Sequence, residues 1–172
     1  PSILPRPRVW NGGMSRAVVR IASDGDAAAV SELLRAYHEH TEAEKVAHDL
    51  QEFGPLAPAY AAEIAAPAFP GSDVLLAEVD DRTIGMVILR VAGADAEIKR
   101  LWVDPAARGA GAGGALIAEA VRRAAAARAA SLRLSVWDWR YDALGLYRSR
   151  GFVEVASWET RERLVCLRMP LR

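Results

Sequence analysis

Apolar residues recur along this chain with two different spacings, and the order of these patterns predicts its secondary structure. Residues 27–40 carry one apolar stripe at helical spacing. The stripe consists of Val30, Leu33, Leu34 and Tyr37. Residues 41–66 are expected to form a second helical stretch, broken at its glycine and prolines. The alanine-rich residues 115–130 predict a long helix, and residues 141–149 predict a short one.

Runs of β-branched and apolar residues, bounded by turn residues, predict the strands. They cover residues 17–21, 73–79, 83–91, 96–103, 132–136, 152–157 and 164–169. The helices and strands follow one another in the order β-α-α-β-β-β-α-β-α-β-β. This order predicts an α/β fold with a mixed sheet, in which parallel and antiparallel strands are combined as in α+β proteins. The strands at 96–103 and 132–136 flank the long helix. We therefore expect them to be parallel neighbours joined by a right-handed crossover.

Composition narrows the class of protein. The 22 basic and 22 acidic residues cancel, which argues against a nucleic-acid partner. No apolar run reaches the roughly 18 residues of a membrane helix, so no membrane partner is expected. Cys166 is the only cysteine, which excludes an intrachain disulfide and a site of paired thiolates. We expect Cys166 to be a small buried residue, and a cytoplasmic location is compatible with a free thiol.

The N-terminal residues differ in character from the rest of the chain. Residues 1–14 are rich in proline and glycine and lack periodicity, which predicts a disordered leader or a segment introduced for expression. Met14 is then the expected natural start. Residues 15–172 are expected to form a single domain.

A glycine-rich loop joins the strand at 96–103 to the long helix. It runs Arg108-Gly109-Ala110-Gly111-Ala112-Gly113-Gly114. Glycines let the backbone approach a ligand closely, and free N–H groups at a helix N-terminus attract an anion. The guanidinium of Arg108 can add a charge-assisted contact to a phosphate oxygen. The loop therefore predicts a phosphate or pyrophosphate site.

This loop has three other interpretations. It contains no Gly-Lys-Ser/Thr, so it is not a nucleotide P-loop. Gly109, Gly111 and Gly114 match a dinucleotide fingerprint, with Asp138 as the ribose acid, although residues 104–108 separate the fingerprint from its strand. Small residues that only allow close helix packing are the third interpretation. Phosphate binding is favoured, and the last two stay open.

The segment from Leu101 to Gly113 resembles the main motif of the GNAT N-acetyltransferase superfamily. That motif has Arg or Gln, two residues, Gly, one residue, and then Gly or Ala. It is matched by Arg108, Gly111 and Gly113. A second family feature is a short helix with Ala and Leu-Tyr, followed by Gly-Phe. It is matched by Ala143, Leu146-Tyr147 and Gly151-Phe152. The resemblance covers roughly residues 17–169.

This resemblance implies acetyl-CoA as the cosubstrate. In the family, the two central parallel strands part at a bulge, and the pantetheine arm lies between them. The implied cofactor-binding residues are Leu101, Trp102, Val103, Arg108, Gly109, Ala110, Gly111, Ala112, Gly113, Gly114 and Arg140. Arg140 stands where the family often has Asn, which puts the contact at that position in question. The resemblance is also compatible with a homodimer.

The implied reaction is direct attack of an amine on the thioester. Family analogy makes Tyr147 the group that assists the departing thiolate, whereas spacing alone favours a core tyrosine. The Val103 N–H is the candidate oxyanion donor. Glu97 lies where some protein-modifying members carry a catalytic Glu. Its other interpretation is a carboxylate paired with Lys99 or Arg100, with water as the base.

The acceptor pocket is expected between the first helices, the parted strands and the last hairpin. Candidate substrate-binding residues are Tyr37, Trp137 and Asp138, with His38, His40, Glu42 and Trp139 nearby in sequence. His38 and His40 point in different directions on a helix, so no metal site is expected. The favoured function is acetyl transfer to a primary amine, on a small molecule rather than a peptide or protein. The alternatives are a non-catalytic acyl-CoA sensor and an NAD-binding domain.

Overall fold

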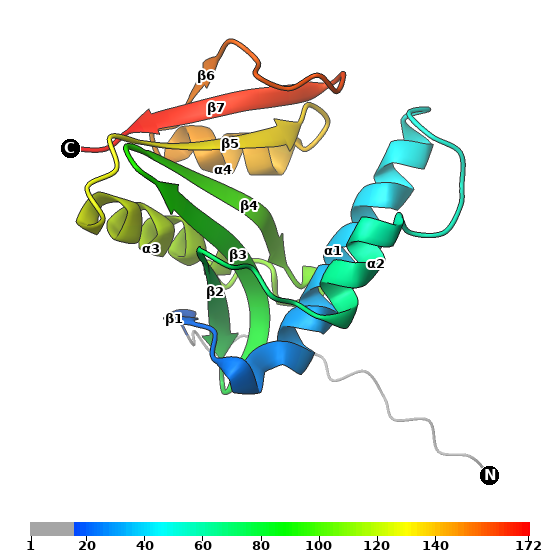
Figure 1. Cartoon of the computed structure of the whole chain (residues 1–172), viewed down its shortest axis with the longest axis horizontal. Helices are drawn as coiled ribbons and strands as arrows, with labels where there is room; N and C mark the ends of the chain where they lie inside the picture. The colour runs from blue at the N-terminus through cyan, green and yellow to red at the C-terminus, as the bar shows by residue number, and fades with distance from the viewer. Residues whose placement is uncertain (1–15) are drawn as a thin grey trace.

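Residues 16–172 are described by a computed structural model, whose elements follow the predicted order (Figure 1). The expected leader, residues 1–14, lies outside the described residues. The strands are β1 (Val18–Ile21), β2 (Ser72–Val79), β3 (Arg82–Ala92), β4 (Asp95–Val103), β5 (Ser131–Trp137), β6 (Val153–Val155) and β7 (Leu164–Pro170). The helices are α1 (Ala27–Ala47), α2 (Pro58–Ala65), α3 (Ala112–Ala126) and α4 (Tyr141–Ser149), with 3-10 turns at Asp24–Asp26 and Pro105–Ala107.

The strands form one mixed sheet in the order β1-β2-β3-β4-β5-β7-β6. All neighbours are antiparallel except β4 and β5, which confirms the predicted parallel pair around the long helix. A two-residue turn joins β2 to β3, and both Asp80 and Asp81 have positive φ. That conformation matches the twist of a tight hairpin.

The parallel pair β4 and β5 is joined only at its start. The paired residues are Asp95 with Ser131, Ala96 with Leu132, and Glu97 with Arg133. Beyond these three pairs the strands part, and their divergence is visible in Figure 1. The sheet is therefore interrupted at its centre, as the family resemblance implied.

A β-bulge bends β4 at the point where it leaves β5. Met86 and Ile88 of β3 have one residue between them, whereas their partners Trp102 and Lys99 have two. One of these two residues, Arg100, has φ 56° in the left-handed region. Bulges of this kind re-aim side chains and end regular pairing.

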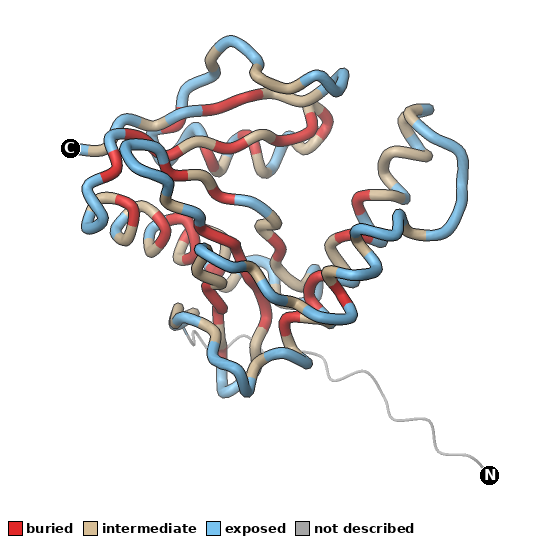
Figure 2. Tube along the Cα trace, viewed as in Figure 1, coloured by how far each residue is buried: buried red, intermediate tan, exposed pale blue. Residues whose placement is uncertain are grey.

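Helices cover both faces of the sheet. One core packs α3 and α4 against the sheet and includes Leu116, Leu132 and Phe152. A second core packs α1 and α2 against the other face of β2 to β4, around Leu34, Leu76 and Met86. Figure 2 shows buried residues concentrated where these helices meet the strands. Cys166 is a buried free thiol in β7, as expected.

The bounds of α1, α2 and α3 differ from the expectation, and α3 ends at Ala126 rather than 130. α1 runs without a break from Ala27 to Ala47, and the second helix covers only Pro58–Ala65. α1 continues past Thr41 because that residue is buried and Arg140 donates to its hydroxyl, 2.7 Å away. α3 begins at Ala112 rather than 115, so the last glycines of the loop lie inside its first turn. None of the helices within residues 16–172 combines the length and apolarity that a bilayer crossing requires.

Candidate active site

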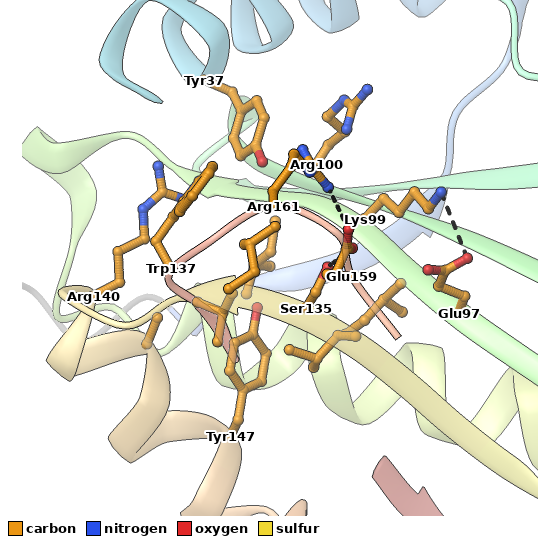
Figure 3. A pocket seen from close by; sticks show the side chains of 16 residues that line it. Tyr37, Glu97, Lys99, Arg100, Ser135, Trp137, Arg140, Tyr147, Glu159 and Arg161 are labelled. Atoms are coloured by element: carbon orange, nitrogen blue, oxygen red, sulfur yellow. Dashed lines mark hydrogen bonds and ion pairs between the residues drawn. The ribbon is translucent and has the colours of Figure 1, made fainter. Parts of the chain in front are cut away.

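Two adjoining hollows lie on either side of the bulged part of β4. The first, the gap cavity, lies between β4 and β5, encloses about 150 Å³, and includes Tyr37, Trp137 and Tyr147 in its lining (Figure 3). The second, the loop groove, encloses about 630 Å³ between the glycine loop and α4. Both are lined by Leu101, Arg140 and Ala143. The two hollows therefore adjoin at these three residues.

The glycine loop lines the loop groove and leaves the first turn of α3 unpaired. Gly109 and Gly111 have φ values of 93° and 75°, and a Cβ at either would meet open space. The Gly111 N-cap offers no side-chain cap, and the first helical bond runs from Ala115 N to Gly111 O at 3.0 Å. The N–H groups of residues 112–114 thus lack helical acceptors and suit an anion.

Arg108 and Arg150 bring positive charge to this helix end. Arg108 lines the loop groove, and its guanidinium carbon lies 5.5 Å from the centre of the Trp102 ring. Stacking on Trp102 orients the guanidinium without using its N–H groups. The Arg150 guanidinium lies so close to Gly114 that a Cβ there would clash with its Nη2. Nothing in the sequence had singled out Arg150.

Backbone groups of β4 face the gap where β5 no longer pairs with them. Asp104 N donates to Ile84 O at 2.7 Å on the β3 side. Successive backbone groups alternate between the two edges of a strand, so the Val103 N–H points away from β3. On that side β5 has departed, and the donor is open to a ligand. Leu101, Trp102 and Val103 all line the loop groove.

Tyr147 lies on α4 with its ring buried and its hydroxyl directed into the gap cavity (Figure 3). The ring packs edge-on against Phe152, with 5.7 Å between centroids. Tyr37 enters the same cavity from α1 on the opposite side. Burial raises the pKa of the Tyr147 phenol, and the nearby Tyr37 raises it further, against a smaller opposing effect of Arg140. Tyr147 is therefore a protonated donor at neutral pH.

Glu97 lies at the foot of the gap, on the last residue pair that β4 makes with β5. Its Oε2 is 3.6 Å from Lys99 Nζ and 4.0 Å from Arg133 Nη2. Arg100, the other partner considered from the sequence, pairs with Glu63 instead. Glu97 lines the gap cavity, but Figure 3 shows its carboxylate turned toward Lys99 and away from Tyr147. Its geometry is that of a paired carboxylate.

Arg140 joins α4 to α1 at the junction of the two hollows. It donates to Glu44 through Nε at 2.8 Å and through Nη2 at 2.6 Å. Burial raises the pKa of Glu44, but the hydrogen bonds and charge of Arg140, together with Trp139 and His40, lower it overall. The Arg140 guanidinium is thus held by α1, and its contact with a cofactor remains a prediction.

The other candidates predicted from the sequence divide between the hollows and the surface. Trp137 lines the gap cavity and stacks on Trp139, 4.8 Å away between centroids. The structure does not bring Asp138 to either hollow, because its carboxylate pairs with Arg163 at 2.9 Å. Glu42 is likewise outside both and pairs with Lys45. Ala110 is the one residue of the glycine loop that lines neither hollow.

A buried ionic network supports the wall of the gap cavity. His38 is 2% exposed, stacks on Tyr60, and lies 2.9 Å from Glu63 through Nε2. Glu63 also accepts from Arg100 at 2.8 Å. Burial lowers the pKa of His38, so its neutral ring donates to the Glu63 carboxylate. This network holds the bulged residue Arg100 against α2. His40 points elsewhere and pairs with Glu44, so the two histidines diverge as expected.

Two residues of the loop between β6 and β7 enter the gap cavity, and the sequence had not indicated them. Glu159 accepts a hydrogen bond from Ser135 Oγ at 2.7 Å and another from Arg161 at 2.9 Å. All three residues line the gap cavity (Figure 3). Their approach depends on the pairing of β7 with β5, which brings residues about two dozen positions apart together. In the sequence, the acidic and basic residues of this loop are typical of an ordinary surface turn.

Comparison with known proteins gives one family and one fold. Residues 70–154 match the family model described as acetyltransferase (GNAT) domain. No curated protein matches the chain. Many solved structures share the fold at low identity, and three are representative. A ribosomal-protein-S18-alanine N-acetyltransferase from Escherichia coli is 17% identical, covering 90% of this chain and 94% of that chain, with a TM-score of 0.67. A GNAT-family acetyltransferase from Staphylococcus aureus is 12% identical, and the match covers 91% of this chain and 99% of that chain, with a TM-score of 0.69. The third is a Salmonella typhimurium protein described as an acetyltransferase and solved with its cofactor acetyl-CoA. It is 19% identical, and the match covers 91% of this chain and 94% of that chain, with a TM-score of 0.66.

Proposed function

Over residues 70–154 this chain is a member of the acetyltransferase (GNAT) family, and from that membership we propose that it transfers an acetyl group from acetyl-CoA to a primary amine. The acceptor is a small molecule, and the transfer is direct, within a complex of protein, cofactor and acceptor. One observation carries the proposal: the loop groove and the gap cavity meet at Leu101, Arg140 and Ala143, where β4 and β5 have parted.

The loop groove fits the cofactor. Its unpaired amides at residues 112–114 and the Arg108 guanidinium suit a pyrophosphate. Positive φ at Gly109 and Gly111 turns the backbone toward that site without a side chain in the way. The bulged part of β4 leads from the loop toward the gap, where unpaired backbone groups suit the amides of a pantetheine arm.

Two groups of the chain serve the reaction. Acetyl-CoA supplies a thioester, whose carbonyl carbon accepts the amine nitrogen while the carbon–sulfur bond breaks. The Val103 N–H is aimed at the gap and donates to the carbonyl oxygen as negative charge develops there. Tyr147 donates a hydrogen bond to the sulfur as it leaves.

Tyr147 assists by hydrogen bonding rather than by giving up its proton. Its pKa is raised by burial, so the phenol is a weaker acid than a thiol, whose usual pKa is about 8.5. A donor hydrogen bond to an anion is nevertheless worth about 1.5–3 kcal/mol. The proton that the sulfur finally acquires comes from the attacking ammonium by way of solvent. The base is water, because Glu97 is turned toward Lys99 and Arg133.

The shape of the gap cavity supports a small acceptor. It encloses about 150 Å³ and is bounded by α1, both parted strands and the β6–β7 loop. A folded protein surface would have to displace these walls, whereas a small amine fits between them. A cytoplasmic location is part of the proposal and is supported by the free buried thiol of Cys166.

The proposal is tested by incubating the purified protein with acetyl-CoA and a panel of primary amines. Release of free thiol, together with an acetylated amine found by mass spectrometry, is the expected result. Acetyl-CoA should also stabilise the protein by about 2.7 kcal/mol at 100 times its Kd, and NAD should not. Stabilisation without thiol release on any amine would instead identify a sensor of the acylated cofactor.

A further inference from the structure

The β6–β7 loop places an ion pair inside the gap cavity that the proposed reaction leaves without a role. Glu159 and Arg161 both line the cavity, with Oε2 and Nη2 2.9 Å apart. Ser135 on β5 donates to the other Glu159 oxygen at 2.7 Å and fixes the carboxylate toward the gap. In Figure 3 this pair lies between Tyr37 and Tyr147. An acceptor in the cavity must therefore lie against it.

The Glu159 carboxylate is ionised and ready to receive a cation. Burial raises its pKa, but hydrogen bonds from Ser135 and Arg161 outweigh burial and lower it, aided by the charge of Lys99. The side chain is 17% exposed, so the cavity retains access to it. A weakly basic, ionised carboxylate holds an ammonium group well and removes its proton poorly.

The Arg161 guanidinium keeps donors free for an anion. Only its Nη2 has a protein partner within residues 16–172, which leaves Nε and Nη1 available. Its guanidinium carbon lies 5.9 Å from the centre of the Trp137 ring, which braces the side chain at the mouth of the cavity. The cavity's other arginines are already engaged: Arg100 with Glu63 and Arg140 with Glu44.

Resting on the proposed function, we propose that the acceptor is a free amino acid or a similar zwitterion, whose ammonium binds Glu159 and whose carboxylate binds Arg161. The two charges of such an acceptor lie antiparallel to the Glu159–Arg161 pair, so opposite charges are neighbours and the existing ion pair stays intact. A diamine or polyamine brings a second cation next to Arg161 and Lys99, where it is repelled. An amine without a carboxylate leaves the free donors of Arg161 unused.

The test compares amines that differ only in the carboxylate. The pairs are L-phenylalanine with 2-phenylethylamine, and L-lysine with 1,5-diaminopentane, with L-phenylalaninamide as a neutral control. Thiol release and product mass give kcat/KM for each. We expect roughly 10-fold or greater preference for the amino acid in each pair, because a hydrogen bond to a charged group is at stake. Arg161→Met should abolish this preference, while Arg163→Met, in the same loop but paired with Asp138 outside the cavity, should retain it.

Glu159→Gln separates the two halves of the site. It should lower kcat/KM for every amine and leave the KM for acetyl-CoA unchanged, since Glu159 lines the gap cavity and not the loop groove. Equal or better use of the decarboxylated amines, or a preference that survives Arg161→Met, would overturn the inference.

Binding gives a second readout that does not depend on turnover. Calorimetry on the protein saturated with coenzyme A should show tighter binding of L-phenylalanine than of 2-phenylethylamine, and Arg161→Met should remove the difference. Absence of binding by every amino acid overturns the inference. Acetylation of amines without a carboxylate preference would overturn the inference and leave the acetyltransferase proposal standing. Amino-acid binding without any transfer would overturn the acetyltransferase proposal and leave the amino-acid site at Glu159 and Arg161 standing.

Discussion

Glu97 and Arg133 are the last partners in the parallel ladder between β4 and β5, and their side chains also approach, with 4.0 Å between Oε2 and Nη2. The next residues of the two strands, Ile98 and Leu134, no longer pair with each other and line the gap cavity. This pair therefore marks the point where the sheet opens. Its charges link the two strands at the foot of the gap, on the side away from the glycine loop.

The position of Glu97 predicts a supporting role. Val103 is six residues further along β4, a path of roughly 20 Å in an ideal strand, which is too far for direct proton transfer. Glu97→Gln should lower kcat by less than about 3-fold, similar to the exposed control Glu154→Gln, because an exposed or partly exposed ion pair contributes about 0–1 kcal/mol. Steady-state kinetics measure this. A loss of about 100-fold or more in Glu97→Gln alone would make it the general base.

Tyr147→Phe removes only the hydroxyl that enters the gap cavity. We expect kcat to fall by roughly 10- to 150-fold, which corresponds to about 1.5–3 kcal/mol for a hydrogen bond to an anion. The KM for acetyl-CoA and the melting temperature should not change, because the ring keeps its contact with Phe152. Tyr60→Phe removes a phenol hydroxyl that lines neither hollow and is the control. Full activity of Tyr147→Phe would make Tyr147 a core tyrosine only.

Much of this arrangement could be predicted from the sequence. Hydrophobic periodicity predicted the element order, and the long helix between two strands predicted the parallel pair. The resemblance in residues 101–113 implied the gap. These features depend on local patterns and on spacing along the chain. The helix boundaries were less accurate. Thr41 is held by Arg140, a contact outside any local pattern, and the first turn of α3 contains glycines, which helix propensity disfavours.

The side chains that line the gap could not be assigned in the same way. Glu159 meets Ser135 only because β7 pairs with β5, and Glu63 meets Arg100 only because α2 packs beside the bulge. Arg100 adopts a left-handed conformation without being glycine, so no local sequence pattern indicates it. Asp138 was expected near the acceptor, but a residue on a strand-to-helix turn can face either way, and Arg163 holds it outside.

Arg108→Ala tests the anion site at the start of α3. We expect the KM for acetyl-CoA to rise by roughly 5- to 30-fold, because about 1–2 kcal/mol of phosphate binding is lost. The kcat should change little, since Arg108 lines the loop groove and is absent from the lining of the gap cavity. Arg35→Ala, an exposed arginine on α1, is the charge-matched control. An unchanged KM would exclude a phosphate contact by Arg108.

Substitution by alanine should have opposite effects on stability at Gly85 and at Gly145. A Cβ on Gly85 would meet the Trp102 carbonyl oxygen at 2.8 Å and would push on the part of β4 that lines the loop groove. Gly85→Ala should destabilise the protein by about 1–3 kcal/mol and raise the KM for acetyl-CoA. A Cβ on Gly145, inside α4, meets nothing, so Gly145→Ala should stabilise by about 0.5–1 kcal/mol. Urea unfolding measures both, and a neutral Gly85→Ala would show that β4 yields freely.

His38 makes the fold sensitive to mild acid. Burial lowers its pKa in the folded protein below the unfolded value of about 6.5, so the unfolded chain binds the extra proton first. Stability is therefore full above that value and falls as the pH drops below it, by at most about 1.4 kcal/mol per pH unit. The carboxylates Glu63 and Glu44, whose pKa values are lowered, contribute only below about pH 4.5. Melting temperatures between pH 7.5 and 5.5 isolate the histidine.

The matched variants for this pH dependence are His38→Gln and His40→Gln. Glutamine at 38 still offers a donor to Glu63 but does not titrate, so the loss of stability between pH 7 and 5.5 should largely disappear. His40 is on the same helix, and its side chain is 44% exposed, so His40→Gln should keep the wild-type dependence. If His38→Gln loses stability with acid as steeply as the wild type, the neutral buried histidine is not its source.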